Sequence, residues 1–144
     1  MDIEMQLNVP VDYFFNRLIE SVLYDIHAQT GKTVRAAQLP NFTYRKKLAN
    51  GNTGHLTVTE YRAGGVYAYK MKTGRNQYHV RYQVTAAEDQ TTRLAYKEEM
   101  VGATSTVTAN NRLTGFMLGW FRKRRFKKMA AEIARDYEQT RLVQ

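Results

Sequence analysis

Three ionisable residues, Lys46, Glu60 and Glu98, fall at positions of strand-like segments where alternation places them on the same face as apolar side chains. An unpaired charge on a buried face costs several kcal/mol, so such groups must pair, reach water or orient a ligand. We favour the interpretation that these positions lie near strand ends or a bulge and reach water. The functional alternative is a polar patch in a cavity that orients a ligand, with Lys46 paired to Glu60 or Glu98. The tyrosines expected on the same face are Tyr44, Tyr69, Tyr82 and Tyr96.

Catalytic and metal chemistry has weaker support in the sequence. Glu60 and Glu98 could form an acid/base pair if burial separates their pKa values, but the sequence gives no distance between them. His27, His55 and His79 are scattered and lack the spacing of metal ligands. The chain has no cysteine, no glycine-rich phosphate loop and no nucleophile elbow. We therefore predict no catalytic residue, no metal and no cofactor.

These residues must be positioned by an alternating strand, a helix and an antiparallel meander. Ile3, Met5 and Leu7 alternate with polar residues, and Pro10 suits the start of a helix that Gly31 can end. Between them, apolar residues recur at helical spacing from Phe14 to Ile26. Short connections rich in Gly, Asn and Asp then separate strand-like runs. The expected strands are Asn41 to Ala49, Gly54 to Arg62, Val66 to Thr73, Gln77 to Ala86 and Thr92 to Val101.

The chain ends in a segment that predicts a long helix from about Asn111 to Leu142. This helix carries two apolar stripes, one from Leu113 to Phe121 and one from Phe126 to Tyr137, on nearly opposite sides. Either the helix bends near Gly119, or the first stripe precedes the regular helix, or it faces a second subunit as in a homodimer. From the first stripe, Met117 and Trp120 join the candidate ligand-binding residues.

Composition sets the outer limits of class and location. With 144 residues, 43% of them hydrophobic, the chain is long enough for one core, and we expect a single domain over residues 1–144. Its start lacks the features of a signal peptide, and no apolar run approaches the roughly 20 residues needed to span a bilayer. We therefore expect a cytoplasmic protein.

The net charge of +9 is concentrated near the C-terminus, where six of the seven residues in 122–128 are basic. Seven helical residues turn nearly twice around the axis, so these charges cannot all face one phosphate backbone. Recognition of nucleic acid usually adds exposed aromatic residues or a known motif. The run is therefore expected to be a solvated helix surface, with contact to nucleic acid or an anionic membrane kept as alternatives.

The order of strand, helix, antiparallel meander and terminal helix resembles the START-related helix-grip superfamily of polyketide cyclases and birch-pollen-allergen proteins. The chain is more closely similar to a family of small uncharacterised proteins from low-GC Gram-positive bacteria, grouped as a domain of unknown function. The segments that carry this resemblance are 21–26, 42–48, 96–99 and 121–128. It implies an α+β helix-grip domain, with a curved antiparallel sheet of about six strands wrapped around a long C-terminal helix. It brings no catalytic motif to these residues.

Three functions follow as hypotheses. We favour a binding protein for a small apolar or amphipathic molecule, held between the sheet and the C-terminal helix. The second hypothesis is an interaction module that uses the basic helix to bind nucleic acid or an anionic membrane surface. The third is a cyclase-like or hydrolase-like enzyme that uses the inner carboxylates.

Overall fold

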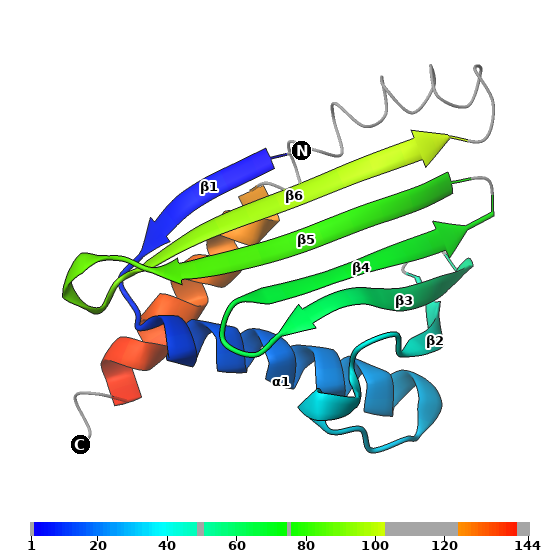
Figure 1. The fold of residues 1–144 in the computed structure, drawn as a ribbon, viewed down its shortest axis with the longest axis horizontal. Coiled ribbons are helices and arrows are strands. Elements are labelled where there is room, and N and C mark those ends of the chain that lie inside the picture. Colours follow the sequence, from blue (N-terminus) through cyan, green and yellow to red (C-terminus); the bar gives the residue numbers. More distant parts are fainter. Residues whose placement is uncertain (1, 49–50, 75, 103–123, 141–144) are drawn as a thin grey trace.

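Six strands form one antiparallel sheet in the computed structural model, which describes residues 2–48, 51–74, 76–102 and 124–140. Their spatial order is β1-β6-β5-β4-β3-β2, so sequential strands are neighbours except that β1 pairs with β6 (Figure 1). The strands are β1 (Asp2–Leu7), β2 (Thr43–Lys47), β3 (Thr53–Arg62), β4 (Val66–Thr73), β5 (Asn76–Ala86) and β6 (Thr92–Gly102). The expected meander is confirmed, with β2 shorter than the sequence indicated.

Helix α1 (Val11–Thr30) is bounded by Pro10 and Gly31, two residues that favour the start and the end of a helix. Pro10 is the residue before the helix, where its missing N–H removes no helical hydrogen bond, and Asp12 lies in the positive first turn. Gly31 adopts a left-handed conformation (φ 75°), and its N–H donates to the carbonyl of His27 at 2.8 Å. The predicted stop at Gly31 is confirmed. The buried stripe of α1 consists of Phe14, Phe15, Leu18, Ile19 and Ile26.

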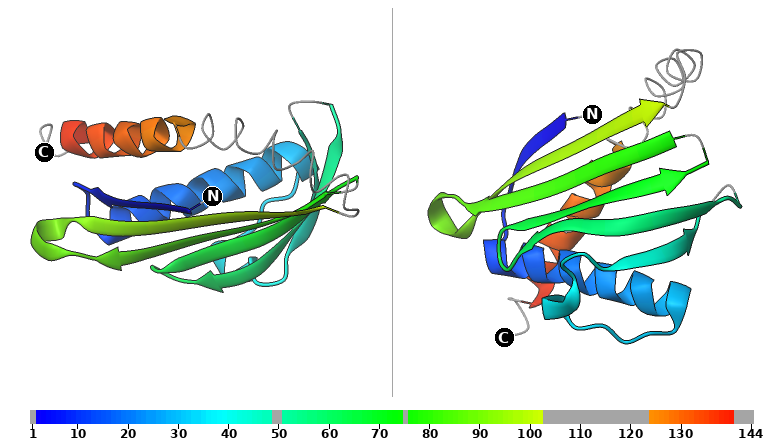
Figure 2. Two further views of the ribbon diagram at one scale, coloured as in Figure 1. Left: turned by 90° about the horizontal axis from the view of Figure 1, so that it is seen from above. Right: turned by 45° about the vertical axis from the view of Figure 1, so that its right-hand side comes forward.

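Residues 124–140 form a second helix, called here the C-terminal helix. Both helices lie on the same face of the sheet, which is its inner face (Figure 2). Phe126 and Ala130 are buried in the same core as the apolar residues of α1 and the strands. The prediction of a sheet packed against a terminal helix is confirmed, although α1 takes a share of the face that we expected this helix to cover. The expected start near Asn111 lies outside the described residues. Two short 3-10 segments, Ala36–Gln38 and Glu88–Gln90, complete the described elements.

A β-bulge in β3 reverses the faces of the residues that follow it. Val58 lies opposite Tyr69, but Glu60 lies opposite Ala68, so Thr59 is the extra residue. Beyond this point Tyr61 faces inward, where it stacks on Phe15 of α1 at 6.2 Å between ring centroids. Strict alternation from Val58 placed Glu60 on the inner face, and that prediction is wrong because the bulge adds one residue.

Thr92 joins β6 to the connection between β1 and α1. Its side chain is fully buried, and its hydroxyl donates to the carbonyl of Val9 at 2.7 Å. Thr92→Val keeps the shape but leaves that carbonyl without its partner, so we expect a loss of about 1–3 kcal/mol in the free energy of unfolding. Urea denaturation measures it. Thr85→Val, at an exposed position of β5, is the matched control and should change stability little. Equal effects of the two substitutions would contradict this role.

Candidate functional site

A row of four tyrosines crosses the inner face of the sheet. Tyr61, Tyr67, Tyr82 and Tyr96 lie opposite one another on β3, β4, β5 and β6. The ring centroids of Tyr67 and Tyr82 are 6.1 Å apart, and those of Tyr82 and Tyr96 are 5.0 Å apart. Such cross-strand aromatic pairs stabilise the sheet and form a continuous aromatic surface.

The two helices contact opposite ends of this row. Tyr61 stacks on Phe15 of α1, whereas Tyr96 lies 4.6 Å from Phe126 of the C-terminal helix, measured between ring centroids. Tyr82 is also 6.0 Å from Phe126. The prediction that Tyr82 and Tyr96 face the terminal helix is confirmed. The middle of the row lies between the two helices.

A polar cluster lies at the other end of α1, above β2. One carboxylate oxygen of Asp25, Oδ2, accepts a hydrogen bond of 2.6 Å from the Tyr44 hydroxyl. The same oxygen lies 2.9 Å from Nζ of Lys46. The side chains of Lys46 and Asp25 are 32% and 28% exposed, so the ion pair is screened only in part. Tyr44 and Lys46 therefore face α1 rather than the C-terminal helix.

Sequence reasoning missed Asp25 as the partner of Lys46. The pairing considered from the sequence used a glutamate of the sheet, but the carboxylate comes from the helix above it. Asp25 follows Val22 by three residues and precedes Ile26, so it falls within the apolar stripe of α1. An acidic residue inside a buried stripe is the signal that could have identified it.

The two predicted glutamates end on opposite faces of the sheet. Glu98 is on the inner face, as expected, and accepts a hydrogen bond of 3.2 Å from the Tyr96 hydroxyl. Glu60 is on the outer face, where Oε1 lies 3.1 Å from Nε of Arg81. Glu60 and Arg81 line a shallow hollow of about 370 Å³ there, together with Lys97 and Glu99, which pair with each other at 3.2 Å. Glu60 and Glu98 therefore cannot share one substrate as an acid/base pair.

Burial keeps the inner tyrosines protonated. It raises the pKa of Tyr44, Tyr67 and Tyr82 well above the usual value near 10, because the phenolate would lose its hydration. For Tyr44, the hydrogen bond to Asp25 raises the pKa further. Tyr69 joins the group through its ring, 5.7 Å from that of Tyr67. The hydroxyls of Tyr44, Tyr67 and Tyr82 therefore stay protonated and can donate hydrogen bonds at neutral pH.

A groove of about 590 Å³ runs between α1 and the C-terminal helix. Its apolar lining comes from Phe14 and Leu18 of α1, Met129 and Ile133 of the C-terminal helix, and Tyr82 of the sheet. Tyr24, the exposed large hydrophobic residue of α1 at 77% exposure, also lines it. Of the tyrosine row, Tyr82 lines this groove.

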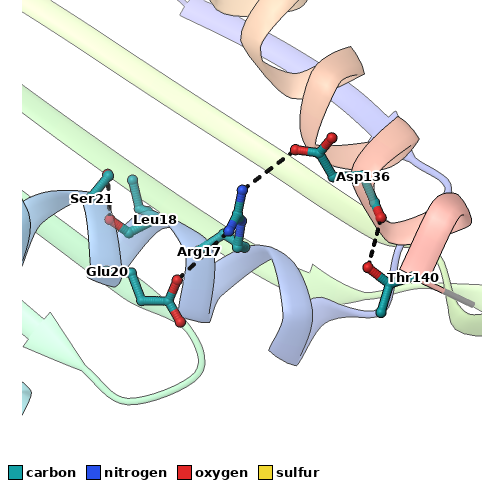
Figure 3. Close-up of polar contacts among 6 residues, drawn as sticks. All are labelled: Arg17, Leu18, Glu20, Ser21, Asp136 and Thr140. Carbon is teal, nitrogen blue, oxygen red and sulfur yellow. Dashed lines mark hydrogen bonds and ion pairs between the residues drawn. The ribbon is translucent and has the colours of Figure 1, made fainter.

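Charged residues of both helices form the rim of the groove. Arg17 lies between them, with Nη2 at 3.4 Å from Oδ2 of Asp136 and Nη1 at 3.9 Å from Oε2 of Glu20 (Figure 3). Glu132 also lines the groove. The sequence pattern had not singled out Arg17 or Asp136, because both lie on faces that appear solvated until the two helices are placed side by side.

The remaining predicted features are of two kinds. Met117, Trp120, Arg122 and Lys123 lie outside the described residues. The other basic residues of the run, Arg124, Arg125, Lys127 and Lys128, are exposed, as expected for a solvated helix surface.

Within the described ranges, no three His, Cys, Asp or Glu side chains converge as a metal site. No helix in the same ranges combines the length and apolarity needed to cross a bilayer.

Comparison with known proteins assigns the family. A family model described as a domain of unknown function (DUF3284) matches residues 1–119. The chain belongs to this family. No curated protein sequence matches the chain.

Solved structures with low sequence identity share the fold. A conserved protein from Geobacillus kaustophilus is 18% identical with a TM-score of 0.55, and the match covers 93% of this chain and 94% of that one. An uncharacterized protein from Rhizobium leguminosarum is 18% identical with a TM-score of 0.51, covering 83% and 88%. DynU16, from the dynemicin biosynthetic locus, is 13% identical with a TM-score of 0.56; the match covers 96% of this chain but only 46% of DynU16. The DUF3284 chain therefore has an α+β helix-grip fold.

The Asp25 cluster leads to a prediction about coupling. Asp25→Ala leaves Lys46 and the Tyr44 hydroxyl without their acceptor, so we expect a loss of about 1–3 kcal/mol in the free energy of unfolding. Adding Lys46→Met should recover part of that loss. In a double-mutant cycle measured by urea denaturation, the interaction energy between the two substitutions should be at least about 0.5 kcal/mol. Lys47→Met, at the exposed neighbouring position, is the matched control and should be additive with Asp25→Ala. Additivity with Lys46→Met would show that the ion pair contributes nothing.

The raised tyrosine pKa values lead to a prediction at alkaline pH. Because the folded state holds the proton more tightly than the unfolded state, the stability from this burial is complete below about pH 10 and falls as the pH rises above it. Tyr44, Tyr67 and Tyr82 should therefore ionise only together with unfolding. Tyrosinate absorbance and circular dichroism, followed over the same titration, measure both events. Ionisation of Tyr44, Tyr67 and Tyr82 near pH 10 in a protein that stays folded would contradict this prediction.

Proposed function

We propose that this protein binds a small apolar or amphipathic molecule in the groove between α1 and the C-terminal helix. The observation that carries the proposal is the groove itself, about 590 Å³ in volume and lined by apolar side chains from three elements. This volume lies within the range of about 300–1,000 Å³ that is typical of small-molecule sites. Six of the eleven residues that line it are apolar or aromatic, and the other five are polar or charged, so the groove offers both kinds of contact to a ligand.

Tyr82 supports the proposal from the floor of the groove. Burial keeps its hydroxyl protonated, and this hydroxyl makes no hydrogen bond to any residue that the structure describes. No enclosed side-chain polar atom of the described residues lacks a hydrogen-bond partner, so this unpaired hydroxyl must be accessible from the groove. A polar group of the ligand could accept this hydrogen bond.

The other expected ligand-binding residues fall into two groups. Tyr69, Tyr96 and Glu98 share the inner face with Tyr82, and we keep them as proposed contacts. Tyr44 and Lys46 are engaged by Asp25, so we propose that they position α1 and contact a ligand only at its far end. Glu60 is not part of the proposed site, because it lies on the outer face.

We also propose that this family is a branch of the START-related superfamily, as the order of its elements suggests. The match in fold to proteins under 25% identical supports this relationship without extending to their ligands. A cytoplasmic location is proposed as well, on the ground that the sequence contains no cysteine for a disulfide.

A pair of tryptophan substitutions on one helix tests the proposal. Ile133→Trp adds a large side chain within the groove, whereas Ala131→Trp adds the same side chain at an exposed position of the same helix. We expect the wild-type protein and Ala131→Trp to bind the neutral dye Nile red and to retain a small molecule in native mass spectrometry. Ile133→Trp should lose both while it keeps its thermal transition. Dye binding that is equal in the two variants would place any ligand elsewhere.

A further inference from the structure

The charge around the groove is opposite in sign to that of the whole chain. The protein carries a net charge of +9, yet the ionisable residues that line the groove are three carboxylates, Glu20, Glu132 and Asp136, and one guanidinium, Arg17. The groove therefore has a local charge of −2 before any ligand enters. Carboxylates placed along one apolar groove attract a positively charged group to it.

The single cation of the groove is already engaged. Arg17 lies 3.4 Å from Asp136 and 3.9 Å from Glu20, so it offers little charge to an incoming anion. An anionic ligand would have to displace Asp136 from Arg17 and then remain beside three carboxylates. Both steps are unfavourable, because like charges repel at short range. The same geometry favours a cation.

Glu132 is the carboxylate that is left for a ligand. It forms no ion pair with any residue in the described ranges, including Lys128, which precedes it by four residues on the same helix. Asp136 follows it by four residues, so the two carboxylates lie on the same face of the helix and repel each other. A cation bound beside Glu132 would relieve this repulsion.

Aromatic rings in the groove suit the same kind of ligand. Tyr82 lines its floor and Tyr24 lines it from an exposed position on α1. The faces of aromatic rings attract ammonium groups, and quaternary ammonium ions are bound in this way in many proteins. The apolar side chains of Phe14, Leu18 and Ile133 would cover the body of the molecule.

We propose that the ligand of this groove is an amphipathic cation, an ammonium group on an apolar or aromatic body, with Glu132 as the main contact of its charge. This inference rests on the proposed function and adds the class of ligand to it. Electrostatic selection by a partly exposed carboxylate is moderate in size and weakens with salt.

Three probes with the same alkyl chain test the inference. Decyltrimethylammonium, decanoate and decyl glucoside are compared below their micelle-forming concentrations as competitors of Nile red at low salt. We expect the cation to displace the dye at a concentration about tenfold lower than decanoate, with the neutral glucoside between them. Added salt should reduce this preference.

Matched variants separate the groove from the rest of the surface. Glu132→Gln should weaken binding of decyltrimethylammonium about threefold and leave the glucoside unchanged. Glu4→Gln, which removes the same charge from an exposed position of β1, should change neither. Ile133→Trp should abolish binding of the cation, and if it does not, the cation adsorbs elsewhere and the inference is wrong.

The outcomes also distinguish this inference from the proposed function. If all three probes displace the dye equally, or decanoate does so best, the groove binds apolar molecules but does not select cations. If neither the dye nor any probe binds to the wild-type protein, both the groove as a binding site and the inference about its ligand are overturned.

Discussion

The inner face of the six-stranded sheet lies against both described helices, and the apolar side chains of all three form one core. The apolar face must be removed from water, because the hydrophobic effect is the main favourable term in folding. The helices contact opposite ends of the tyrosine row, at Tyr61 and at Tyr96, and the groove lies over Tyr82 between them.

The use of tyrosine on this face follows from the same constraint. Tyr67 and Tyr96 are buried, whereas Tyr61 and Tyr82 are partly exposed. A tyrosine suits both situations, because its ring packs against apolar neighbours and its hydroxyl can reach a polar one. A phenylalanine row would expose more apolar surface wherever the helices leave a gap. A row of charged residues would lose hydration under the helices. Lys46 and Glu98 are charged residues of this face: Asp25 from the helix above balances the charge of Lys46, and Glu98 accepts a hydrogen bond from Tyr96.

Most of the fold could be predicted from the sequence, because it depends on local patterns. The alternation in β1, the helical spacing in α1, the stop at Gly31 and the turn residues between strands each act over a few residues. Features that depend on one inserted residue, or on which two elements meet, were not predictable in this way. Thr59 shows the first kind: nothing in its type marks a bulge, yet it moves Glu60 to the outer face and Tyr61 to the inner one.

Most of the candidate site depends on which elements meet in the fold. Alternation identified Tyr82, Tyr96 and Glu98 correctly as inner residues, because each lies on a regular strand. Asp25, Arg17 and Asp136 come from helices, and their partners become apparent only when both helices are placed on the sheet.

The ion pairs of this protein differ in what they can contribute, and burial decides the difference. Arg17 and Asp136 are 44% and 53% exposed, and water and salt screen such a pair strongly. Lys46 and Asp25 are more buried, and Asp25 also accepts a hydrogen bond from Tyr44. The Asp25 cluster therefore fixes the C-terminal half of α1 on β2, while the weaker contact of Arg17 links α1 to the C-terminal helix. The C-terminal helix is held mainly by its buried residues Phe126 and Ala130, and by the ring of Tyr137, which lies 4.9 Å from that of Tyr13 on α1. The exposed ion pair of Arg17 therefore adds little to the position of this helix.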